Sequence, residues 1–124
     1  MQQSIVSIVA VAPFVLSCAA SFPPPTQRLA DAQAVERSAR EVGANDAPAA
    51  QLSLKNTQDQ IVQAQKAMSA GENETADGLL LRAKADGELA LAQAREKMAH
   101  AERNEAVKDS NDQKATNAGQ GAVK

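Results

Sequence analysis

Two residue types that often carry chemistry occur once each in this 124-residue chain, as Cys18 and His100. A thiol can act as a nucleophile, bind a metal or receive a covalent group, and an imidazole can move protons or bind a metal. Catalytic and metal sites built on these groups need further partners at defined spacings. His100 has only Glu96, Glu102 and Arg103 around it, as on a solvated helix face. We therefore predict no enzyme activity, no catalytic residue, no metal and no cofactor, and consider Cys18 as an attachment point.

The residues before Cys18 have the features of an export signal. Residues 5–16, IVSIVAVAPFVL, are apolar and uncharged, and no Lys, Arg, Asp or Glu precedes Arg28. This run is shorter than the roughly 20 residues of a membrane-spanning helix. It has the length of the apolar region of a secretory signal, about 7–15 residues. We expect residues 1–17 to be a signal peptide.

The sequence VLSC, formed by Val15, Leu16, Ser17 and Cys18, resembles the lipobox of bacterial lipoproteins. That pattern has an aliphatic residue three positions before the cysteine and a small residue directly before it. The resemblance implies cleavage before Cys18 and a lipid on its thiol, with Ala19 favouring the outer membrane, facing the periplasm. Two alternatives stay open. Cleavage at an ordinary small-residue site would release a soluble secreted or periplasmic chain, and an uncleaved signal would act as an anchor.

The remaining composition predicts a thin helical core and excludes some ligands. Leu, Ile, Val and Phe make up 15 of the 107 residues after Ser17, whereas Ala, a strong helix former, is abundant. The net charge is -2 and only two aromatic residues are present. Nucleic-acid binding needs a basic surface and often aromatic stacking, so we predict no nucleic-acid partner. No small-molecule substrate is inferred.

Proline, glycine and helix-capping residues divide this region into a spacer and three helices. Residues 18–26 form a Pro-rich spacer that would carry the lipid. Thr26 is a suitable N-cap for a first helix that begins at Gln27 and ends at Gly43. Asp46 and Pro48 predict the start of a second helix, which ends at Gly71.

Asn73 predicts the start of a third helix that reaches about Lys108. Small and apolar residues at steps of three and four mark one face of each long helix. They are Leu54, Thr57, Ile61, Ala64 and Met68 in the second helix, and Ala76, Leu80, Ala83, Gly87, Ala90, Ala94 and Ala101, interrupted by Lys97, in the third.

Together these elements predict an all-α fold. A short N-terminal helix packs with a long antiparallel αα-hairpin in one three-helix domain over residues 27–108. The third helix is longer than the second, so its end has no partner within the chain. Residues 109–124 lack an apolar period and are expected to be a disordered tail. Glu36–Arg40, Arg82–Asp86 and Lys84–Glu88 are four residues apart and predict surface ion pairs.

Two stretches carry a resemblance to a known family. FPPPTQRLADAQAVERSARE and MSAGENETADGLLLRAKADGELA resemble bacterial envelope lipoproteins of domain-of-unknown-function family 4398, over about residues 22–104. The resemblance implies an all-helical envelope protein of unknown function, and it brings no catalytic motif.

These observations lead to one preferred function and one alternative. The preferred function is a lipid-anchored helical lipoprotein, structural or partner-binding, whose partners are the membrane through Cys18 and either an envelope protein or a second copy. In the alternative, the final residue Lys124 is joined covalently to peptidoglycan. That plan is similar to an abundant enteric envelope lipoprotein, anchored at its first cysteine and linked through its last lysine.

Overall fold

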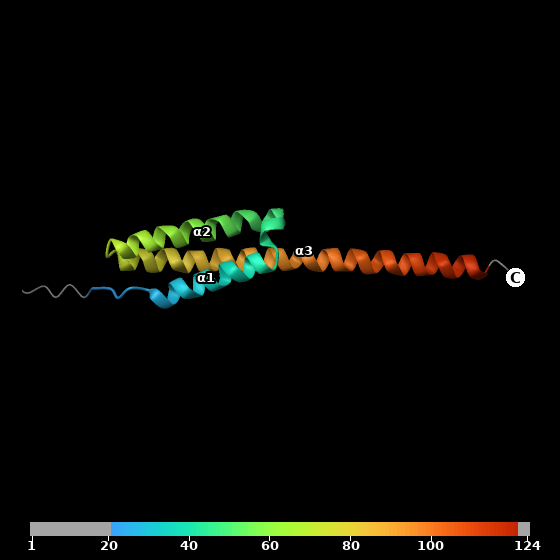
Figure 1. The fold of residues 1–124 in the computed structure, drawn as a ribbon, viewed down its shortest axis with the longest axis horizontal. Coiled ribbons are helices and arrows are strands. Elements are labelled where there is room, and N and C mark those ends of the chain that lie inside the picture. Colours follow the sequence, from blue (N-terminus) through green and yellow to red (C-terminus); the bar gives the residue numbers. More distant parts are fainter. Residues whose placement is uncertain (1–20, 122–124) are drawn as a thin grey trace, which may run out of the picture.

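The protein is an elongated three-helix bundle in which one helix extends far beyond the other two. A computed structural model describes residues 21–121. The helices are α1 (Thr26–Glu41), the short 3-10 helix η1 (Ala44–Asp46), α2 (Pro48–Ser69) and α3 (Asn73–Gly121). α3 lies between α1 and α2, runs parallel to α1 and antiparallel to α2, and continues as a single helix beyond both (Figure 1). The predicted all-α fold with its antiparallel α2–α3 hairpin is confirmed.

The core is narrow because alanine supplies most of it. Leu54, Ile61 and Leu80 are its only buried large aliphatic residues within the described range, and the other buried apolar residues are alanines and Pro25. They form two clusters along the bundle, one around Ile61 and Leu80 and the other around Leu54. Alanine buries little apolar surface but lets helix axes approach closely, so contact between backbones replaces thick side-chain layers.

The predicted buried faces agree with the structure over most of their length. Leu54, Thr57, Ile61 and Ala64 are buried in α2, and α3 is buried at every predicted position from Ala76 to Ala94. Met68 is half-buried. Ala101 is exposed, contrary to expectation, because α1 and α2 do not extend that far along α3.

The three helices approach one another closely at Gly87 of α3. A Cβ atom added there would lie 2.8 Å from Cγ1 of Val35 in α1 and 3.4 Å from Cγ2 of Thr57 in α2. The Thr57 hydroxyl is fully buried and donates a hydrogen bond of 2.9 Å to the carbonyl of Ser53, so it needs no external partner. A residue without a side chain is therefore required where α1 and α2 meet α3.

Two glycines reverse the chain. Gly43 follows α1 with φ of 89°, and Gly71 follows α2 with φ of 79°, a left-handed conformation that favours glycine. At the end of α2, the Glu72 N–H donates a hydrogen bond of 2.8 Å to the Ala67 carbonyl, and the Gly71 N–H donates one of 3.1 Å to the Met68 carbonyl. This is the Schellman pattern that ends helices.

The predicted N-caps differ from the structure. Thr26 is already the first residue of α1, and no side-chain cap bond is formed there. Asp46 belongs to η1, and Ala47 precedes Pro48 at the start of α2. Pro48 explains the second shift, because its fixed φ starts a helix without help from a capping side chain.

α3 also continues past its predicted end near Lys108. The helix extends to Gly121, so residues 109–121, expected to lack regular structure, are helical. An apolar period is needed for burial, not for helix formation. Once the packed half of α3 has formed, each added residue gains one backbone hydrogen bond without a new nucleation step. No proline interrupts residues 73–121.

We expect Gly87→Ala and Gly78→Ala to change stability in opposite directions. Gly78 has open space around it, so alanine there gains helix propensity of about 1 kcal/mol. At Gly87 the same gain is outweighed by overpacking of about 1–3 kcal/mol, since Val35 has few rotamers available in a helix. Thermal unfolding followed by circular dichroism should show a lower midpoint for Gly87→Ala and a higher one for Gly78→Ala. A Gly87→Ala midpoint at or above wild type would contradict the packing argument.

We expect amide hydrogen exchange to divide α3 into two parts. Amides from residue 80 to 94 lie in the bundle and should be the best protected in the helix. Amides from residue 95 onward have only their intrahelical bonds, so local fraying should expose them much faster. Exchange followed by mass spectrometry of peptides from α3 would test this. Uniform protection along the whole helix would show that its second half is covered in solution.

Candidate functional site

The residues predicted to attach the protein lie outside the described residues. These are Val15, Leu16, Ser17 and Cys18 at one end and Lys124 at the other. The structure does show how the chain enters the bundle from residue 21 onward, and what surface the far half of α3 offers.

The Pro-rich segment is bound to the beginning of α3. The side-chain amide of Asn73 donates a hydrogen bond of 2.8 Å to the carbonyl of Phe22. One turn further along each helix, Arg28 of α1 pairs with Asp77 of α3. Asn73 was predicted as a helix cap, and its contact with a residue 51 positions earlier had no signal in the sequence. The two contacts fix the point where the spacer enters the bundle.

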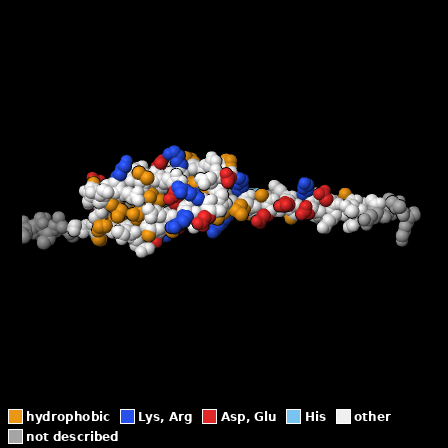
Figure 2. All heavy atoms as spheres, viewed as in Figure 1, with side chains coloured by type: hydrophobic (Ala, Val, Ile, Leu, Met, Phe, Trp, Pro, Cys, Tyr) orange, Lys and Arg blue, Asp and Glu red, His pale blue; other side chains and the backbone are white. Residues whose placement is uncertain are grey.

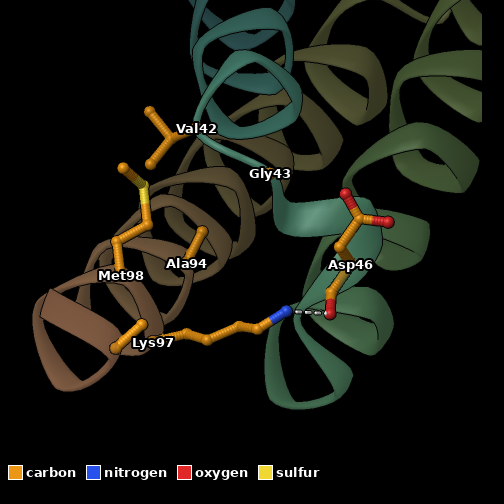
Figure 3. Close-up of a pocket in the computed structure, with 7 residues that line it drawn as sticks. Val42, Gly43, Asp46, Ala94, Lys97 and Met98 are labelled. Atoms are coloured by element: carbon orange, nitrogen blue, oxygen red, sulfur yellow. Dashed lines mark hydrogen bonds between the residues drawn. The ribbon is translucent and has the colours of Figure 1, made fainter. Parts of the chain in front are cut away.

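At the opposite end of the bundle, Lys97 connects α3 to η1. Its ammonium group donates to the backbone carbonyl of Asp46, which would otherwise face solvent (Figure 3). Beside this bond is a cavity of about 240 Å³, lined by Val42, Gly43, Asp46, Ala94, Lys97, Met98 and Ala101. The interruption of the predicted apolar line at Lys97 was the sequence signal for this contact. The charged residue lies where the apolar partners of α3 end.

Polar pairs also hold the middle of the bundle in register. Gln60 of α2 donates a hydrogen bond of 2.7 Å to Asp86 of α3. Asp86 therefore contacts α2, whereas the sequence predicted that it forms an ion pair with Arg82 within α3. The predicted surface pairs Glu36–Arg40 and Lys84–Glu88 are both present, the second at 3.8 Å.

The second half of α3 is an isolated charged helix. Every residue from 95 to 119 is exposed, and both signs of charge alternate along it (Figure 2). His100 lies on this helix with Nε2 at 3.5 Å from Glu96 and Nδ1 at 2.9 Å from Arg103. Both contacts lie within one exposed face of α3, and His100 also lines an open depression of about 380 Å³ beside Pro48 and Gln93. Within residues 21–121, no three His, Cys, Asp or Glu residues are grouped to hold a metal ion.

Across residues 21–121, none of the helices combines the length and the apolar character that crossing a bilayer requires.

The bundle and the exposed part of α3 together correspond to a known protein family. The family model described as domain of unknown function (DUF4398) matches residues 27–118. The chain belongs to this family. The DUF4398 match begins at the second residue of α1 and covers most of the isolated half of α3, so that half is part of the family domain. Neither a search of curated proteins nor a search of solved structures finds a match.

We expect Lys97→Ala to weaken the end of the bundle more than Lys108→Ala does. Both changes remove the same side chain from α3, but only Lys97 has the described bond to η1. Losing it should lower the free energy of unfolding by about 0.5–1 kcal/mol relative to the Lys108 variant. Urea unfolding of both variants would measure this difference. Equal stabilities would show that the Lys97–Asp46 bond contributes nothing in solution.

Proposed function

We propose that this DUF4398 protein is a lipoprotein of the bacterial envelope, anchored in the outer membrane through a lipid on Cys18, whose helices bind another envelope component. The observation that carries the proposal is the sequence VLSC directly after an uncharged apolar run. A free cysteine with no second cysteine to pair with is a liability in an oxidising compartment, and acylation removes it. Two acyl chains also hold a protein at a bilayer stably, where one chain binds only marginally.

The geometry of the described residues supports a bundle held close to its anchor. Cys18 and Phe22 are four residues apart, so a fully extended chain spans about 14 Å between them. The Asn73–Phe22 bond then holds the chain at the first turn of α3. The start of α3 would accordingly stay near the lipid headgroups.

From this point α3 gives the protein a long reach. Its 49 residues correspond to about 73 Å at 1.5 Å per residue. A helix with charges on all sides and no fold partner is suited to contact with another macromolecule. The proposed role is therefore that of a spacer or adaptor, which presents this helix within a fixed radius of its anchor.

Metabolic labelling with an alkynyl fatty acid tests the anchor. Wild type should take up label and fractionate with the outer membrane, whereas Cys18→Ser should carry only background label. As a matched control, Ser21→Cys in the Cys18→Ser chain restores a thiol three positions outside the VLSC sequence. It should stay unlabelled, because the peptidase pattern is absent there.

The alternative of a soluble exported chain gives a different outcome. In that case wild type and Cys18→Ser would carry equal label and both would appear in the soluble periplasmic or secreted fraction. Such a result would end the lipoprotein proposal.

A further inference from the structure

α3 has an apolar face that neither α1 nor α2 covers. Helical geometry places Gly78, Ala85 and Ala92 on one line, at steps of seven, on the side opposite the buried line from Ala76 to Ala94. Leu81 and Leu89 lie on either side of this line, and each is 48% exposed. We call these five residues the outer face. Two half-exposed leucines around small residues form a surface suited to another helix.

Charges along one border of the outer face follow a symmetric order. Asp77, Lys84, Glu88 and Arg95 share this border, and their signs alternate from negative to positive. Lys84 and Glu88 are equally distant from residue 86, and so are Arg95 and Asp77, although Asp77 is already paired with Arg28 of α1. An antiparallel copy of α3 centred on residue 86 therefore brings each of these charges opposite one of the other sign. Such self-complementarity is what a two-fold symmetric interface requires, because residue i meets j and j meets i.

From this arrangement we propose that two copies of the protein pair through their outer faces, with the α3 helices antiparallel and Ala85 near the two-fold axis. In a parallel two-fold pair, this border of one α3 would instead face the opposite border of the other, so Lys84 would not meet Glu88 of the second copy. In the antiparallel arrangement, the small residues at Gly78, Ala85 and Ala92 allow the helix axes to come close. Leu81 and Leu89 of each chain then cover the small residues of the other.

The pairing is expected to be weak. The overlap from Asp77 to Arg95 is about 27 Å long, and a single helix pair of this length buries less than a standard interface of about 1,200–2,000 Å². We therefore expect a weak dimer whose population rises with protein concentration. The pairing does not depend on the lipid, so Cys18→Ser should dimerise as wild type does, and failure here leaves the anchor proposal untouched.

Charge reversal tests the interface directly. The purified full chain, kept in a mild nonionic detergent, would be studied by sedimentation over a concentration series. Lys84→Glu and Glu88→Lys should each raise the dissociation constant at least tenfold. In a dimer of either variant, residues 84 and 88 carry charges of the same sign and face each other at two symmetric places. An equimolar mixture of these two variants should dimerise again, since an acidic border then meets a basic one. Loss of the Lys84–Glu88 bond within each chain cannot explain this rescue.

The pair Lys55 and Asp59 of α2 supplies the matched control. It has the same spacing as Lys84 and Glu88 and is also exposed, but it lies on another helix. Lys55→Glu should leave the dissociation constant unchanged. A wild-type chain that is monomeric at every concentration, or a dimer equally tight in all variants, would overturn the proposal.

Crosslinking with a short bismaleimide tests the orientation. In the Cys18→Ser full chain, Ala85→Cys should crosslink to itself. Leu81→Cys alone should react little, but its mixture with Leu89→Cys should give a mixed dimer. Strong self-crosslinking of Leu81→Cys, with no mixed product, would show a parallel pair and contradict the antiparallel assignment.

Discussion

The close approach at Gly87 is the constraint on which the rest of the bundle depends. This protein has few large aliphatic side chains in its core, so it gains stability by bringing three helix backbones close together. At Gly87 the neighbouring side chains leave no room for an added methyl group. Thr57 fits the same constraint. Its hydroxyl bonds within α2, so its methyl group can contact the glycine without leaving a buried polar atom unpaired.

A bundle of this kind is defined by polar contacts at its borders as much as by its core. Alanine faces are similar to one another along a helix, so apolar packing alone specifies register weakly. Gln60–Asp86 in the middle, Arg28–Asp77 near the start and Lys97–Asp46 at the far end each join residues that only one register brings together. The three contacts are small in energy but distributed along the bundle, and they distinguish the native alignment from one shifted by a turn.

The sequence predicted the helices and their buried faces because both depend on local rules. Gly43 and Gly71 ended helices where predicted, and the spacing from Ala76 to Ala94 identified the covered side of α3. Apart from the interruption of the apolar line at Lys97, contacts between distant segments had no such signal. Asn73 was recognised as a helix start, yet its bond to Phe22 depends on the path of the Pro-rich segment, which residue spacing does not determine. The end of α3 was placed too early because loss of apolar periodicity marks the end of packing, whereas a helix ends only where its backbone is broken. For the attachment residues Cys18 and Lys124, the sequence remains the basis of the prediction.

The parallel arrangement of α1 and α3 has a mechanical consequence. The chain enters at the start of α1 and leaves at the distant end of α3, so tension between Phe22 and the far helix end pulls these neighbouring helices in opposite directions along a shared seam. The seam is then loaded in shear. Its contacts must yield together, whereas a hairpin pulled from one end opens one contact at a time. A domain with a thin core and modest equilibrium stability can in this way resist stretching along its axis.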